Sequence, residues 1–111
     1  MRPPPCAASP SATTLADSGD VEVEVTTLDD DIAEPLTMIK ADIEGSEYKA
    51  LLGAARHIRE DRPKLLISVY HNNEDLWRTP RLIDSLSSGY TFYLRHKGSP
   101  LYPTEITLLA L

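Results

Sequence analysis

The chain has 111 residues, enough for one domain of ordinary size, and its 17 acidic residues outnumber its 11 lysines and arginines. The resulting net charge of −6 argues against nucleic acid as a partner, because phosphate binding needs clustered basic side chains. The sequence has no apolar stretch of the roughly 20 residues that a membrane span needs, no secretory signal and a single cysteine, Cys6, so we expect a cytoplasmic protein without a membrane partner.

The N-terminal segment differs in composition from the rest of the chain. Residues 1–20 hold four of the nine prolines, with Ala, Ser and Thr between them, and offer little surface to bury, so we predict a disordered tail. Order is predicted to begin at Val21–Thr26, where β-branched and polar residues alternate as in a half-buried strand. Leu28–Ile32 then predicts a short helical turn or loop.

The central part of the chain has the pattern of a strand, a helix and a second strand. Leu36–Ala41 and Lys64–Tyr70 are nearly continuous in apolar character, which is typical of strands covered on both faces. Between them, apolar residues recur at helical spacing from Ser46, a candidate N-cap, to the basic turn before Pro63. Because a crossover of this length joins parallel neighbours, we predict a parallel βαβ unit.

The C-terminal part predicts one more helix and a hairpin. Glu74–Leu86 has a helical pattern with an interruption at Thr79-Pro80, where a threonine N-cap and a first-turn proline would start a new helix. Tyr90–Arg95 and Ile106–Leu111 have strand patterns, and the loop between them is rich in Gly and Pro, which favours an antiparallel hairpin. The predicted fold class is therefore α/β, with a mostly parallel sheet that ends in this hairpin.

Acidic residues follow the first buried strand directly, in the sequence Asp42-Ile43-Glu44-Gly45-Ser46-Glu47. In continued strand geometry Asp42 and Glu44 would point to the same face, at the end of a parallel strand where open α/β sheets bind ligands. Carboxylates there could bind a divalent cation, bind a ligand or act as a general base. The alternative is that they stabilise the positive end of the following helix, and for Glu47 this alternative is the favoured interpretation.

His71 ends the second buried strand, so we expect it on the same rim as Asp42 and Glu44. Its imidazole titrates near neutral pH and suits proton abstraction from a hydroxyl group. The alternative is a histidine that is hydrogen-bonded to loop backbone, and Asp75 either orients His71 or begins the next helix. Trp77 and the other aromatic residues are predicted to lie in the core rather than in an acceptor pocket.

Two further predictions concern residues away from this rim. His57 and His96 are predicted to lie on the surface, because one falls near a helix end and the other on a late strand. Asp29, Asp30 and Asp31 form a short acidic run, for which a solvated loop is favoured over a metal site. Neither group is expected to take part in the chemistry of the rim.

Several elements together resemble the C-terminal half of FkbM-type methyltransferases over residues 21–111. The most specific is Ile39-Lys-Ala-Asp-Ile-Glu-Gly-Ser-Glu47, and it is supported by Ser68-Val-Tyr-His71, Glu74-Asp-Leu-Trp77, and Leu94-Arg-His96. The resemblance implies a Rossmann-like sheet of seven strands whose last strand runs antiparallel. Val21–Thr26 would be its third strand, and the four later strand segments would be its fourth to seventh.

The resemblance also implies an activity. The family transfers a methyl group from S-adenosylmethionine to hydroxyl groups of sugars and natural products, and a divalent cation could assist. Asp42, Glu44 and His71 are then the candidate catalytic residues, Asp42 also the candidate donor-binding residue, and Asp42 with Glu44 the candidate metal ligands. Candidate substrate-binding residues are Glu47, Asn72, Asp75 and Trp77.

One part of the family pattern has no counterpart in this sequence. The glycine-rich donor loop after the first strand and the acidic residue after the second strand are absent, so we expect a truncated domain that is inactive alone. The chain would then associate with itself or with a complementing N-terminal half, because its fourth strand would be an uncovered edge. The alternatives are a non-catalytic fragment and, with weaker support, a metal-dependent hydrolase.

Overall fold

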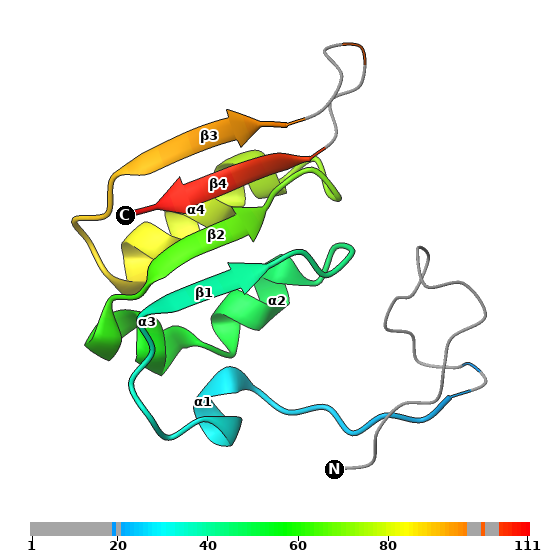
Figure 1. Cartoon of the computed structure of the whole chain (residues 1–111), viewed down its shortest axis with the longest axis vertical. Coiled ribbons are helices and arrows are strands. Elements are labelled where there is room, and N and C mark those ends of the chain that lie inside the picture. Colours follow the sequence, from blue (N-terminus) through cyan, green and yellow to red (C-terminus); the bar gives the residue numbers. More distant parts are fainter. Residues whose placement is uncertain (1–18, 20, 98–100, 102–104) are drawn as a thin grey trace.

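The computed structural model describes residues 19, 21–97, 101 and 105–111, and its strands form one open sheet in the order β1-β2-β4-β3 (Figure 1). β1 pairs with β2 in parallel, and β4 runs antiparallel to both β2 and β3. The predicted βαβ unit and the predicted hairpin are therefore both confirmed. The strands are β1 (Met38–Ala41), β2 (Lys64–Ser68), β3 (Phe92–His96) and β4 (Ile106–Ala110).

The main helices cover one face of this sheet (Figure 1). They are α2 (Glu47–Leu52), α3 (Ala55–Asp61) and α4 (Asp75–Leu86), and a short helix α1 (Leu28–Asp31) precedes β1. The hydrophobic core lies between helices and strands, because alternate strand residues point to the helix side. Its fully buried members are Leu51, Ala54, Ile58, Leu65, Ile67, Val69, Ile83, Leu108 and Ala110. In the described part of the chain no helix is long and apolar enough to cross a membrane.

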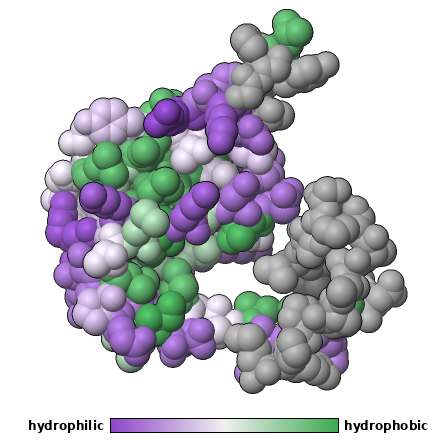
Figure 2. All heavy atoms as spheres, in the orientation of Figure 1, coloured by the Kyte–Doolittle hydropathy of each residue, from purple (hydrophilic) through white to green (hydrophobic). Residues whose placement is uncertain are grey.

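The opposite face of the sheet carries no helix among the described residues. Leu66 and Leu109 pair across β2 and β4 there and are only half-buried, and Met38 and Tyr93 are exposed at the two edges of the sheet. Figure 2, in the orientation of Figure 1, shows hydrophobic residues among polar ones on this face. We call it the open face.

The single helix predicted between the first two strands is wrong, because the chain breaks at Gly53 into α2 and α3. The cause is α1, which docks on this corner. A Cβ atom at Gly53 would lie 3.0 Å from the Thr27 Cβ, and the Asp29 backbone N–H donates to the Gly53 carbonyl at 2.9 Å. The Asp29 carboxylate then accepts from two backbone N–H groups in the first turn of α3, those of Arg56 and His57, at 2.8 and 3.2 Å.

Two surface predictions are wrong at the same corner. The His57 side chain is fully buried, with Nδ1 2.7 Å from Asp29 Oδ1 and Nε2 3.2 Å from the Glu34 carbonyl oxygen. Asp29 is accordingly half-buried and tied to α3 rather than part of a solvated run, whereas Asp30 and Asp31 are exposed. Both errors involve the docking of α1, which brings Asp29 against His57. His96 is exposed, as predicted.

The strand predicted at Val21–Thr26 is also wrong. Residues 21–27 run without helix or strand assignment, and all of them are exposed. An alternating pattern forms a strand only when it pairs with a neighbouring strand, and residues 21–27 belong to none of the four paired strands of the described sheet. The predicted tail of residues 1–20, with Cys6, lies outside the described residues except for Gly19, and so does most of the loop between β3 and β4.

The predicted interruption of the second helix at Thr79-Pro80 does not occur. α4 is continuous from Asp75 to Leu86 and contains Pro80 in its interior. Thr79 is fully buried, and its hydroxyl group has no hydrogen-bond partner in the structure, so it does not act as an N-cap. Burial of the apolar side of α4, which includes Ile83, outweighs the backbone hydrogen bond that a proline removes.

Candidate functional site

The acidic loop, which we define as residues 42–47, leaves the end of β1 in an unusual backbone conformation. Glu44 has φ 57° and Gly45 has φ 100°, so both residues occupy the left-handed region. For a glutamate this conformation is strained by about 1–2 kcal/mol, whereas glycine adopts it freely. A Cβ atom at Gly45 would also approach the Asn72 side chain to 3.4 Å, and the Asn72 amide donates to the Gly45 carbonyl oxygen at 3.1 Å.

Glu47 holds this loop from inside the molecule. Its side chain is fully buried, and its carboxylate accepts from the backbone N–H groups of Ile43 at 2.5 Å and Gly45 at 3.0 Å. Hydrogen bonds from backbone N–H groups satisfy a buried carboxylate and offset the cost of removing it from water. A first-turn glutamate was expected to interact with the helix dipole, but here the side chain also fixes the loop that precedes its helix.

His71 follows β2 and lies directly beside the acidic loop. Its Nε2 atom is 3.7 Å from Asp42 Oδ1 and 3.5 Å from Glu44 Oε2, and its Nδ1 atom is 3.4 Å from Glu47 Oε2. The predicted juxtaposition of the imidazole with the acidic pair is therefore present. The side chain of His71 is 13% exposed, compared with 54% for Asp42 and 48% for Glu44. The ring sits between exposed carboxylates on one side and a buried carboxylate on the other.

Tyr70 completes the surroundings of the imidazole. Its ring lies against that of His71, with 4.1 Å between ring centroids and an angle of 30° between their planes. Burial raises the pKa of the Tyr70 phenol above its usual 10.0, and the negative charges of Asp42 and Glu44 raise it further. Tyr70 is therefore a neutral hydrogen-bonding group at this rim and not a base near neutral pH.

The other candidate residues have different surroundings. Asn72 holds the acidic loop, as described above, and also donates to Asp75 Oδ2 at 3.4 Å. Asp75 is fully buried at the start of α4, and its carboxylate accepts from Arg78 Nε at 2.7 Å instead of orienting His71. Trp77 is more than half exposed, beside the Arg81 guanidinium. The prediction of a core position is thus wrong for Trp77, and also for Tyr93, which is exposed at the edge of the sheet.

Oxygen and nitrogen atoms suitable for a divalent cation converge at this rim. Asp42, Glu47 and His71 each offer one ligand atom, and these atoms all lie within 4.8 Å of one another. Sequence reasoning named Asp42 and Glu44 as the candidate ligands and missed the contribution of Glu47. The helical pattern after Ser46 does not indicate that the Glu47 side chain points into the molecule.

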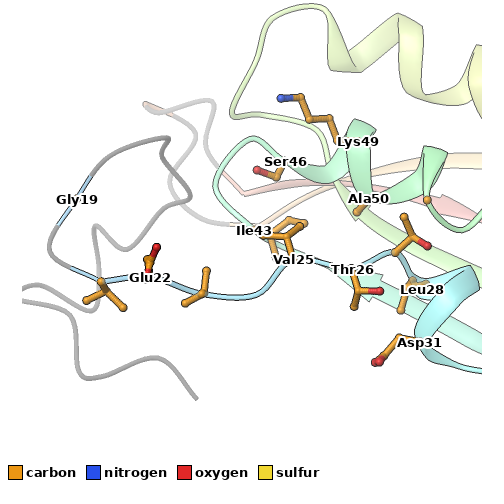
Figure 3. Close-up of a pocket in the computed structure, with 14 residues that line it drawn as sticks. Gly19, Glu22, Val25, Thr26, Leu28, Asp31, Ile43, Ser46, Lys49 and Ala50 are labelled. Carbon is orange, nitrogen blue, oxygen red and sulfur yellow. The ribbon is translucent and has the colours of Figure 1, made fainter. Parts of the chain in front are cut away.

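A separate hollow of about 870 Å³ lies between the extended residues 21–27 and the start of α2. Figure 3 shows Ser46 and Lys49 on its α2 side and Glu22 and Thr26 on the side of the extended segment. Ile43 of the acidic loop also lines this hollow, but the carboxylates of the rim do not. The hollow therefore borders the acidic loop, but Asp42, Glu44 and His71 do not line it.

The family described as the methyltransferase FkbM domain matches residues 4–98. This chain belongs to the FkbM methyltransferase family. The crystal structure of methyltransferase FkbM from Methylobacillus flagellatus KT is similar to it, with 42% sequence identity and a TM-score of 0.70, over 76% of this chain and 22% of that chain. No curated protein matches the chain.

The FkbM assignment confirms the family that the sequence motifs indicated. β4, the last strand, runs antiparallel to both of its neighbours, β2 and β3, as the resemblance implied for the last strand of the family's sheet. The chain nevertheless spans about a fifth of the length of the Methylobacillus protein. The described residues include the strand ends with Asp42, Glu44 and His71, but they include no glycine-rich turn that would hold a nucleotide-like donor.

Proposed function

We propose that this chain forms the acceptor side of an S-adenosylmethionine-dependent O-methyltransferase that acts on a hydroxyl group of a sugar or natural product. The observation that carries this proposal is the position of His71 Nε2, 3.7 Å from Asp42 and 3.5 Å from Glu44 at the rim formed by β1 and β2. Its support is membership of the FkbM family together with this geometry. A cytoplasmic setting is part of the proposal, on the sequence grounds given above.

In the proposed mechanism His71 removes the proton from the acceptor hydroxyl group, with Asp42 as the alternative base. The nearly buried ring is held between its neighbours, and a fixed base at hydrogen-bond distance from a bound hydroxyl group favours proton transfer. The carboxylates of Asp42 and Glu44 stabilise the imidazolium that results. S-adenosylmethionine, when bound, supplies the methyl group.

The described residues do not by themselves fit the whole methyl donor. Asp42 and Glu44 provide negative charge at the end of β1, which suits a sulfonium or an ammonium group, but the described residues form no cradle for adenosine. Donor binding is therefore proposed to need a complementing N-terminal half. A second copy of the chain cannot supply a motif that the chain itself lacks, so we favour the complement over self-association for activity.

The proposal is tested by titrating S-adenosylmethionine into the chain alone and into the chain mixed with the N-terminal region of the Methylobacillus protein. We expect donor binding in the mixture, and methyl transfer to a panel of sugar and polyol acceptors. His71→Ala should reduce the transfer rate about 100-fold or more while donor binding is kept. His96→Ala, an exposed histidine on β3, is the control. Absence of donor binding in both samples would contradict the proposal.

The open face favours a second candidate function, a split-domain half without chemistry of its own. On this face Leu66 and Leu109 are only half-buried, so apolar surface is left uncovered. The edge strand β1 pairs on one side only within the described chain, so backbone polar groups are uncovered on its other side. In this case the mixture would form a stable complex but would transfer no methyl group. Family membership favours either candidate over the metal-dependent hydrolase.

A further inference from the structure

We propose that Glu47 is a positioning residue that keeps the proton of the neutral His71 ring on Nδ1 and so leaves Nε2 open as the base. The inference rests on the proposed function for the role of Nε2, but the position of the proton is a property of this chain alone. Neither the sequence motifs nor the family match assigns such a role to Glu47.

The two ring nitrogens of His71 have different surroundings. Nδ1 is buried, lies 3.4 Å from Glu47 Oε2 and has no hydrogen-bond partner among the described residues. Nε2 instead faces Asp42 and Glu44, whose side chains are about half exposed. A separation of 3.4 Å is longer than an ideal hydrogen bond, so the link between Nδ1 and Glu47 is a contact between a charge and a dipole.

Burial decides which nitrogen keeps the proton. A lone pair on Nδ1 would face the Glu47 carboxylate oxygen in surroundings without water, and the two would repel each other, whereas an N–H group there is attracted. Around Nε2 the charges of Asp42 and Glu44 are screened by solvent and their side chains can turn away. Tyr70, the remaining titratable neighbour, contacts the face of the ring and therefore does not discriminate between its nitrogens.

The Glu47 carboxylate cannot easily turn away from His71. Both of its oxygen atoms accept backbone hydrogen bonds, from Ile43 and Gly45, so the side chain is fixed in its orientation. The same two bonds hold the left-handed backbone that brings Glu44 to Nε2. One buried side chain thus sets both the direction of the imidazole proton and the position of the acidic loop.

The test is the tautomer of His71, measured by long-range ¹H–¹⁵N correlation spectra of the full chain above the pH at which the ring titrates. His71→Gln assigns the signals. We expect the Nδ1 resonance at the chemical shift of a protonated ring nitrogen and the Nε2 resonance at that of an unprotonated one. Predominant Nε2–H in the wild-type chain would overturn the inference, and this result does not depend on whether any variant folds.

A pair of variants separates the buried carboxylate from the exposed ones. Glu47→Gln should shift the tautomer population toward Nε2–H, because an amide can donate to Nδ1, whereas Glu44→Gln should leave the proton on Nδ1. An unchanged spectrum in Glu47→Gln would overturn the assigned role. Methyl transfer is not involved in these measurements. If the chain transfers no methyl group but the spectrum shows the proton on Nδ1, the proposed function fails and the role of Glu47 stands.

Discussion

The three carboxylates of the acidic loop differ in their exposure to solvent, and this difference separates what each can do. Asp42 and Glu44 are about half exposed and can meet a ligand, whereas Glu47 is buried and can act only through its neighbours. A substrate-binding role for Glu47 is therefore an indirect one in our proposal, exerted through His71 and the loop backbone. The spacing Asp-x-Glu-Gly-x-Glu places these three environments within six residues.

Asp29, outside the acidic loop, has surroundings that change the pKa of its carboxyl group. Burial raises its pKa, but hydrogen bonds from the backbone N–H groups of Arg56 and His57 and from the His57 ring lower it more, so the pKa lies below the usual 3.8. A carboxyl group with a lowered pKa in the folded state stabilises the fold above its unfolded pKa, and this contribution is lost as the pH falls through the folded value.

We therefore predict that Asp29→Asn lowers the free energy of unfolding by about 1–2 kcal/mol at pH 7, where the carboxylate is charged. The difference from the wild-type chain should shrink as the pH falls below 3.8, because the wild-type carboxyl group then becomes protonated. Urea unfolding at a series of pH values measures this. Asp30→Asn, in the exposed neighbour, should show no comparable change, and a difference independent of pH would contradict the charge argument.

At the scale of elements, the strands and helices that form the core follow from local pattern. The segments Leu36–Ala41 and Lys64–Tyr70 contain β1 and β2, and the helical spacing after Ser46 contains α2 and α3. The break at Gly53 could not be predicted, because its cause is α1, a segment more than twenty residues away in the chain. The same docking buries His57, a residue whose local pattern indicates a surface position.

The candidate site was predictable to a similar degree. The rule that ligands bind at the carboxyl ends of parallel strands was sufficient to bring His71 close to Asp42 and Glu44. The inward turn of Glu47 was not predictable, since it depends on the left-handed backbone at Glu44 and Gly45. An isolated sequence contains no periodic signal for such a conformation in a glutamate.

α4 provides a prediction at this scale, because it tolerates a proline in its interior. Pro80 cannot donate a hydrogen bond to the carbonyl group of Leu76 one turn earlier. Pro80→Ala should raise the free energy of unfolding by about 1–2 kcal/mol, the helical gain being reduced by the greater freedom of the unfolded chain. Chemical denaturation measures the change. Asp84→Ala, exposed on the same helix, is the control, and a destabilised Pro80→Ala would show that packing of the proline ring dominates.

The described part of the molecule is a sheet with helices on one face and an open face on the other. No described element covers Leu66 and Leu109 on the open face, so both are only half-buried. β1 is an edge strand of the same sheet. Most α/β sheets cover both faces, so we expect the open face to be covered by another chain or by a further part of a longer protein.

We predict that the chain associates with itself in a concentration-dependent way when no complement is present, and that Met38→Lys weakens this association. Met38 is 56% exposed on the edge strand β1, where a lysine opposes pairing between strands. Sedimentation velocity at several concentrations measures the effect. Leu94→Lys is the matched control, because Leu94 is 60% exposed on β3 at the far edge. Equal effects of the two variants would show that β1 is not the edge involved.

The docking of Thr27 and Asp29 onto the corner between α2 and α3 has a consequence for how genes of this kind can be rearranged. These contacts anchor the polypeptide just ahead of β1. Recombination at a point upstream of Thr27 would therefore move a gene segment that still encodes the acidic loop, His71 and the contacts that hold them. New N-terminal partners could be joined at that boundary without changing the residues that bring Asp42, Glu44 and His71 together.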